Sequence, residues 1–203
     1  MSTEGYVKYS AEHKTAPVMD APGWAALNDA RTRLRRLNLI GSNPSGVGFG
    51  NVSIRVTGNE FLITGTATGA PMELGKNEYC LVRSFDLKAN HVVSEGPVRA
   101  SSESMTHGAI YISNPAVNCV IHIHSREIFD GMLRDHYPST PADAEYGTPE
   151  IALAVEKCSA GINSSEGSIV MAGHDEGVIA FGPSVDRALN LILDLNKKYR
   201  NKP

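Results

Sequence analysis

Apolar residues recur along the chain with two spacings, one typical of helices and the other typical of strands. Between Trp24 and Leu37 an apolar residue returns every three or four positions, which predicts a helix with one buried face. From Val52 to Val56 apolar and polar residues alternate, which predicts a half-buried strand. The same signals predict further strands at 61–64, 79–82, 91–93, 117–124, 168–172 and 178–181, and further helices at 102–112, 126–133, 150–159 and 183–199.

The order of these elements bounds the fold class. Pairs of strands joined by short turns alternate with helices, and short turns join antiparallel neighbours. The sequence therefore predicts an α/β fold with a largely antiparallel or mixed sheet covered by helices. A chain of 203 residues suits one domain. We expect residues 1–20 to be a loosely ordered lead-in and residues 21–203 to form that domain.

Composition and charge argue against several classes of function. The net charge is -3 and no long basic block occurs, so nucleic acid is not an expected partner. The polar N-terminus, and the lack of any stretch near the roughly 20 apolar residues that span a bilayer, predict neither a signal peptide nor a membrane segment. The cysteines Cys80, Cys119 and Cys158 lie far apart, which fits a reducing compartment. We therefore expect a cytoplasmic protein.

Two histidines one residue apart carry the strongest chemical signal. His122 and His124 lie in the most apolar predicted strand, and residues i and i+2 of a strand point to the same face. Two neutral imidazoles there suit zinc or another divalent transition metal, although two hydrogen-bonded structural histidines also fit the pattern. His174, in the turn between the last two predicted strands, is a third candidate ligand. Three protein ligands leave one position open, as in catalytic zinc sites.

Charged residues near these histidines are candidates for supporting roles. Glu103 stands at the start of a predicted helix, and His107 lies one turn later on the same side. Asp175 and Glu176 follow His174 directly. One of these two carboxylates hydrogen-bonds to a metal ligand and orients it, or both are solvated residues of the turn.

Three loops offer polar groups to an anion. Ser101 and Ser102 stand at a predicted helix start, where free backbone N–H groups favour phosphate, with a plain helix cap as the alternative. Residues 48–53 contain two glycines and Asn51, with an ordinary turn as the alternative. Residues 64–69 are rich in threonine and glycine but lack the Gly-Lys-Ser/Thr of a Walker loop. Beside a metal site, the three loops together indicate a phosphorylated substrate.

Taken in order, these motifs resemble the class II aldolase/adducin family. The similarity covers roughly residues 24–195, and the combination is specific although each motif alone is not. The family contains sugar-phosphate aldolases, epimerases and dehydratases, together with the non-catalytic adducin heads. The matching segments are Gly50-Asn51-Val52-Ser53, Leu62-Ile63-Thr64 with its Thr/Gly loop, Ser101-Ser102-Glu103, His122-Ile123-His124-Ser125 and the distant His174.

The resemblance implies a three-layer α/β/α domain around a central, mainly antiparallel sheet. It implies that His122, His124 and His174 hold zinc or another divalent transition metal, and that Glu103 is the acid/base that also approaches the metal in the free enzyme. It further implies a homo-oligomer, with a tetramer favoured. The residues that it assigns to the substrate and its phosphate are Gly50, Asn51, Thr66, Thr68, Gly69, Ser101 and Ser102, with Tyr137 and Tyr146 as candidate substrate-side tyrosines.

The implied activity is that of a zinc-dependent carbon–carbon lyase, an aldolase of carbohydrate metabolism that cleaves a small ketose phosphate through a metal-stabilised enediolate. A dehydratase or epimerase on the same scaffold is the second candidate. Glu103 disfavours the epimerases, which tend to have aspartate there. A non-catalytic, adducin-like interaction domain is the third, although the adducin heads lack the metal ligands.

Two departures from the family pattern concern the site. His174 is followed by Asp-Glu-Gly, whereas a glycine usually follows this histidine directly. The loop at residues 65–69 is longer than the usual Thr-Pro-Thr-Gly. The phosphate pocket and the substrate are therefore where we expect this chain to differ from its relatives.

Overall fold

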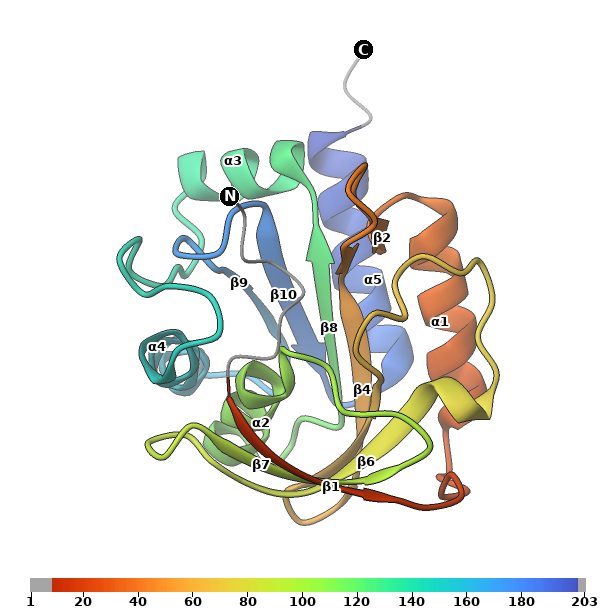
Figure 1. The fold of residues 1–203 in the computed structure, drawn as a ribbon. Coiled ribbons are helices and arrows are strands. Elements are labelled where there is room, and N and C mark those ends of the chain that lie inside the picture. Colours follow the sequence, from red (N-terminus) through yellow and green to blue (C-terminus); the bar gives the residue numbers. More distant parts are fainter. Residues whose placement is uncertain (1–8, 201–203) are drawn as a thin grey trace.

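An eight-stranded sheet forms the centre of the protein in the computed structural model, which describes residues 9–200 (Figure 1). Its strands are β1 (Ser10–Thr15), β4 (Asn51–Thr57), β5 (Glu60–Thr64), β6 (Tyr79–Asp86), β7 (His91–Gly96), β8 (Cys119–His124), β9 (Gly167–Val170) and β10 (Gly177–Gly182). They follow the order β1-β7-β6-β5-β4-β8-β10-β9. Every neighbouring pair is antiparallel except β1 with β7.

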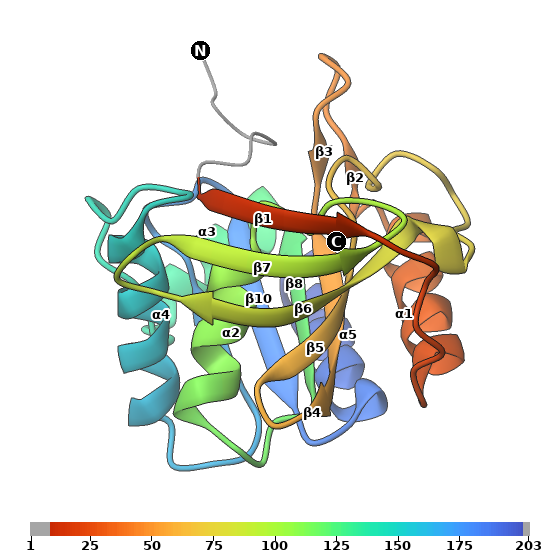
Figure 2. The ribbon, with the colours of Figure 1, turned by 60° about the horizontal axis from the view of Figure 1, so that its bottom comes forward.

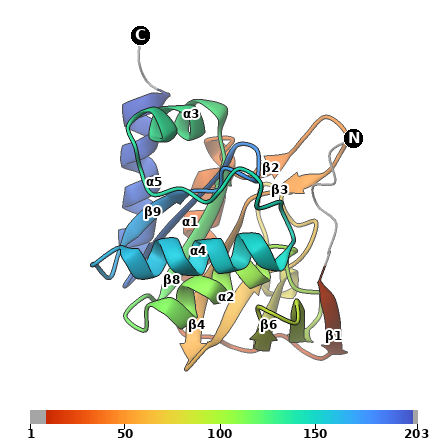
Figure 3. The same cartoon turned by 90° about the vertical axis from the view of Figure 1, so that its left-hand side faces the viewer.

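Helices cover both faces of this sheet. They are α1 (Trp24–Arg36), α2 (Ser104–Ser113), α3 (Arg126–Arg134), α4 (Pro149–Gly161) and α5 (Val185–Tyr199), with one short 3-10 turn, η1 (Lys76–Glu78). The helices α1, α3 and α5 pack on one face, and α2 and α4 lie side by side on the other (Figures 1 and 3). The expected three-layer α/β/α arrangement is confirmed. Among the described residues, none of these helices is long and apolar enough to cross a membrane.

The central strands separate two hydrophobic cores and aim the histidines into one of them. In β8, Ile121 belongs to the core beneath α1 and α5, so His122 and His124 face the side covered by α2 and α4. The strands β4 and β10 flank β8, with Asn51 opposite His122 and Gly177 opposite His124. This register brings the ends of three strands together beneath the start of α2.

Residues 10–15 differ from the expected loosely ordered lead-in, because they form the edge strand β1, parallel to β7 (Figure 2). The strand is Ser-Ala-Glu-His-Lys-Thr, and most of its side chains are exposed. Backbone pairing with β7 creates it, so no alternation of apolar residues could reveal it. Residues 1–8 and 201–203 lie outside the described part of the chain. The division into a lead-in and a domain at 21–203 stays a prediction.

A small hairpin lies between α1 and β4. Its strands are β2 (Gly41–Ser42) and β3 (Gly48–Phe49). The Asn43 side chain closes the turn, because its Oδ1 accepts a hydrogen bond from the backbone N–H of Val47 at 3.0 Å. The hairpin leads directly into β4 and therefore ends beside the histidines.

The start of α2 also differs from the expectation. The helix begins at Ser104, and Glu103 rather than Ser101 or Ser102 occupies the N-cap position. Ser101 still contributes, because its Oγ accepts a hydrogen bond from the backbone N–H of Glu103 at 3.3 Å. The result is that the Glu103 carboxyl group stands at the very end of the helix, where it reaches the sheet.

Candidate metal centre

Three buried histidines meet at one end of the sheet. His122 and His124 come from β8, and His174 comes from the turn between β9 and β10. The candidate ligand atoms of the three side chains all lie within 4.8 Å of one another. No other group of three or more histidine, cysteine, aspartate or glutamate side chains comes this close together among the described residues. The structure therefore brings together the three histidines that the sequence suggested as metal ligands.

The hydrogen bonds of His122 favour metal binding. Its Nδ1 lies 3.2 Å from the carbonyl oxygen of Val178, which can only accept, so Nδ1 carries the proton and Nε2 presents a lone pair. That Nε2 is 3.1 Å from Nε2 of His124. Two nitrogens bound to one tetrahedral zinc at about 2.0–2.1 Å are separated by about 3.3 Å, so the spacing fits a shared ion. Burial, and then the neighbouring His122 and His174, hold the pKa of His124 well below its usual value, which keeps it neutral.

Glu103 faces the histidines from the start of α2. Its Oε1 lies 3.3 Å from Nδ1 of His174, and its Oε2 accepts a hydrogen bond from Oγ1 of Thr106 at 2.9 Å. Burial raises the pKa of this carboxyl group, but the positive charge and hydrogen bonding of His174, with His122 and Thr106, outweigh burial and lower the pKa to about 2. Glu103 is therefore an ionised, buried carboxylate beside three possible metal ligands.

His107 lies close to this group without joining it. Its Nδ1 is 2.7 Å from Oγ of Ser53, which in turn lies 2.8 Å from the hydroxyl of Tyr111. Burial, and then the charge of His122, lower the pKa of His107 to about 3. A neutral imidazole tied into a hydrogen-bonded chain beneath the site is a structural role, so His107 is not a fourth ligand here.

A cavity of about 20 Å³ opens at the three histidines and Glu103. Of the residues assigned to the substrate by the family resemblance, Gly50, Asn51, Ser102 and Tyr146 line it. The full lining consists of Gly48, Phe49, Gly50, Asn51, Ser102, Glu103, His122, His124, Tyr146 and His174.

The other expected substrate residues lie outside this lining. The loop with Thr66, Thr68 and Gly69 packs behind it: a Cβ added to Gly48 would lie 3.3 Å from the backbone nitrogen of Gly69. The backbone N–H of Thr66 bonds to Arg99, so the loop runs beside residues 99–102. Ser101 is buried behind Ser102 and accepts, through its carbonyl oxygen, a hydrogen bond from Tyr9 at 3.0 Å.

Tyr137 differs from Tyr146 in its surroundings. Tyr137 packs against the core on the other face of the sheet, with the Lys198 ammonium 5.3 Å from its ring centroid. Tyr146 instead packs against His174, with ring centroids 4.5 Å apart and the planes tilted by 54°. Only Tyr146 of the two therefore reaches the cavity.

Some contacts around the site had no signal in the sequence. Arg31 is buried in α1, and its guanidinium donates to the carbonyl oxygens of Thr68 and Gly69 at 2.7 and 2.9 Å, which fixes the threonine loop. Arg126 of α3 pairs with both Asp175 and Glu176 and so anchors the turn that bears His174. The ring of Phe49 contacts the ring of His124, which is a third contact without a signal in the sequence. Each joins segments far apart in sequence, which no local pattern records.

Gly50 is required by its backbone conformation and by its neighbours. Its φ is +74°, and a Cβ there would lie 2.7 Å from Cγ1 of Ile40 and 3.1 Å from the carbonyl oxygen of His122. We expect Gly50→Ala to destabilise the fold by roughly 1–3 kcal/mol, which corresponds to about 2–4 °C in Tm per kcal/mol for a domain of this size. Gly46→Ala is the matched control, because Gly46 has φ +80° but nothing within 4 Å of an added Cβ. Equal melting temperatures for the two variants would show that the close approach at Gly50 is unimportant.

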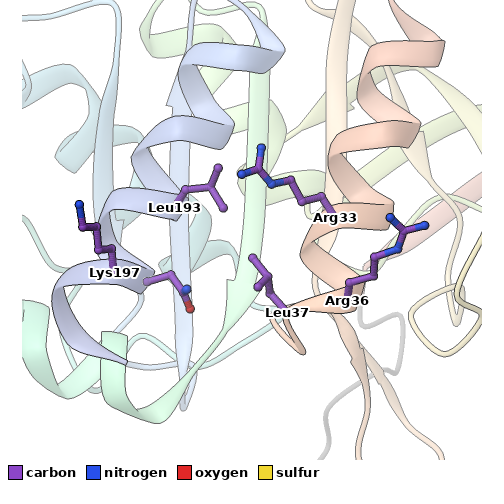
Figure 4. Close-up of a pocket in the computed structure, with 6 residues that line it drawn as sticks. Arg33, Arg36, Leu37, Leu193 and Lys197 are labelled. Atoms are coloured by element: carbon purple, nitrogen blue, oxygen red, sulfur yellow. The ribbon is translucent and has the colours of Figure 1, made fainter. Parts of the chain in front are cut away.

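A second cavity lies away from the histidines, between the C-terminal ends of α1 and α5 (Figure 4). Its lining combines Leu37 and Leu193 with the cations Arg33, Arg36 and Lys197. These cations stand in the last turns of their helices, or directly beside them, where positive charge balances the helix dipole. Its lining contains no carboxylate, histidine or cysteine, so it does not offer the metal ligands that meet at the histidine centre.

Comparisons with known proteins agree with this geometry. The family model described as Class II Aldolase and Adducin N-terminal domain matches residues 40–200. No curated protein matches the sequence. Solved structures with a similar fold include the L-fuculose-1-phosphate aldolase from Thermus thermophilus, with 21% sequence identity, a TM-score of 0.60, and coverage of 86% of this chain and 89% of that chain.

Two further solved structures show the same fold. For YgbL from Klebsiella pneumoniae the sequence identity is 18%, the TM-score 0.64, and the coverage 87% of this chain and 86% of that chain. For a sugar-phosphate aldolase from Thermotoga maritima the sequence identity is 19%, the TM-score 0.60, and the coverage 85% of this chain and 89% of that chain. The family model spans most of the sequence, including every histidine of the centre. The chain belongs to the class II aldolase and adducin family.

Proposed function

We propose that this protein is a zinc-dependent aldolase that cleaves a carbon–carbon bond in a small ketose phosphate. The observation that carries the proposal is the convergence of His122, His124 and His174 with the Glu103 carboxylate at one buried cavity. Imidazole binds zinc in its neutral form, and three protein ligands leave a position for substrate. Relatives of similar fold that act on sugar phosphates, such as the L-fuculose-1-phosphate aldolase, support the substrate class.

The three histidines would hold the ion, each through one ring nitrogen. When bound, zinc supplies Lewis-acid stabilisation of negative charge that develops on a carbonyl oxygen of the substrate. The Val178 carbonyl holds His122 in the tautomer that presents Nε2. Arg126 anchors the turn that carries His174, through its pairs with Asp175 and Glu176. These contacts prepare the ligand set before an ion binds.

Glu103 moves the proton in this proposal. Cleavage of a ketose removes a proton from a hydroxyl group and later returns one to carbon, so the residue must accept and donate in turn. The pKa of about 2 makes Glu103 an ionised base in the free protein. Thr106 binds its Oε2, which leaves Oε1 directed at the histidines.

Neutral groups would bind the phosphate. Gly50 and Ser102 line the cavity, and Asn51 is nine-tenths buried with no hydrogen-bond partner for its Oδ1 among the described residues. In this proposal the phosphate-binding residues are supported by four residues that do not line the cavity themselves: Thr66, Thr68, Gly69 and Ser101. We further propose a homotetramer in which Tyr137, outside the cavity of its own chain, serves a neighbouring subunit.

Aldol cleavage by zinc-loaded protein tests the function. A panel of ketose 1-phosphates is incubated with the protein, and the released aldehyde and ketone phosphate are measured. We expect cleavage of at least one compound, its loss on dialysis against a chelator, and its return on adding zinc. A product with an unbroken carbon skeleton would instead indicate a dehydratase or an epimerase. No turnover of the panel by zinc-loaded protein would contradict the proposal.

A further inference from the structure

Phe49 walls one side of the histidine centre. Its ring centroid lies 5.3 Å from that of His124, and the two planes are tilted by 35°. Tyr146 packs in a similar way on His174, with centroids 4.5 Å apart. Both rings line the cavity at the histidines, whose volume is about 20 Å³. That volume is room for about one water-sized particle, so the atoms next to a metal-bound group lie close to the lining, which includes both rings.

The position of the Phe49 ring is fixed by glycines. Phe49 pairs with Gly41 in the β2–β3 hairpin, and a Cβ added at Gly41 would lie 3.0 Å from Cζ of the ring. The ring therefore rests on the bare backbone of Gly41. On either side, Gly48 packs on the threonine loop, and Gly50 packs on Ile40. A ring held between a backbone surface and a metal-ligand histidine cannot move aside without losing these contacts.

We propose that Phe49 is a specificity-determining residue that restricts the metal centre to small, unbranched oxygen chelators, such as a two- or three-carbon hydroxycarbonyl unit. This inference rests on the proposed function, because it needs a metal ion at the three histidines. A branched group next to the chelating atoms meets the Phe49 ring. Tyr146 and the buried histidines form other parts of the lining, so the Phe49 ring is one of several walls close to the chelating atoms.

Two metal chelators of different shape test the inference on zinc-loaded, full-length protein. Acetohydroxamate is small, and 2,2-dimethylpropanohydroxamate has the same chelating atoms but a branched carbon beside them. Calorimetric titration of the wild type should show tighter binding of acetohydroxamate by about tenfold or more, the size of effect that extra carbon atoms have in a fitted pocket. Phe49→Ala should remove most of this preference by strengthening binding of the branched ligand. Phe49→Leu, which keeps apolar bulk, should retain the preference.

The controls separate this inference from the proposed function. Zinc content and Tm are measured for each protein first. Absence of zinc from the wild type overturns the proposed function and this inference with it. Zinc-loaded wild type with equal affinity for the two ligands overturns this inference alone, as does a preference that persists in Phe49→Ala. If Phe49→Ala fails to fold, Phe49→Trp replaces it. Its larger ring should weaken even acetohydroxamate, and unchanged affinity would overturn the inference.

Discussion

Replacing His124 with alanine is expected to abolish zinc binding, from about one ion per wild-type chain to almost none. Three imidazoles converge within 4.8 Å, and removal of one leaves two ligands and a gap in the wall of a buried cavity. The loss of zinc affinity should exceed the roughly 10- to 100-fold loss seen when a residue that hydrogen-bonds to a metal ligand is removed. Elemental analysis of identically prepared proteins measures the effect.

His91→Ala is the matched control for this experiment. His91 lies on β7, four strands from β8 in the sheet, and pairs with Glu12 at 3.4 Å. Its removal should leave zinc content unchanged, so any difference from His124→Ala reflects the centre itself. Retention of zinc by His124→Ala would contradict the ligand assignment. A wild-type protein without metal, even after zinc supplementation, would favour the adducin-like interaction domain.

The sequence predicted the parts of the centre that depend on local periodicity. Alternation along β8 places His122 and His124 on one face while Ile121 enters the opposite core, and any strand of this pattern would do the same. The turn between two strands likewise predicted where His174 stands. Long, regular patterns of this kind also predicted the main helices and a sheet covered by helices, whereas the three-layer arrangement was implied by the family resemblance.

Features that depend on distant contacts were not predictable. The strand β1 exists because its backbone pairs with β7, although its side chains are polar. The Phe49 ring lies on His124 because a short hairpin, with two residues in each strand, turns the chain back towards β8. Arginine is mostly exposed in proteins, yet Arg31 of α1 is buried against the carbonyl groups of the threonine loop. In each case the partner is far away in sequence, so composition and spacing carry no record of it.

Glu103→Gln is expected to leave zinc content unchanged while slowing proton exchange at carbon by roughly 10²- to 10⁴-fold, the usual contribution of a positioned acid or base. The change removes the charge but keeps the shape, and the glutamine carbonyl oxygen can still accept the hydrogen bond from Thr106. The substrate for the measurement is the three-carbon ketone phosphate that cleavage of a ketose 1-phosphate would release. Its exchange in D₂O is followed by proton NMR.

A second variant distinguishes loss of the base from disturbance of the site. Thr106→Val removes the hydroxyl group that binds Oε2 but leaves the Glu103 carboxylate itself in place. Because the pKa of Glu103 is held near 2 mainly by the histidines, with Thr106 the last of the contributing groups, the base remains ionised. Exchange should therefore slow far less in Thr106→Val than in Glu103→Gln. Equal rates in the two variants would indicate that Glu103 acts by holding the shape of the cavity. An unchanged rate in zinc-loaded Glu103→Gln would rule it out as the group that moves the proton.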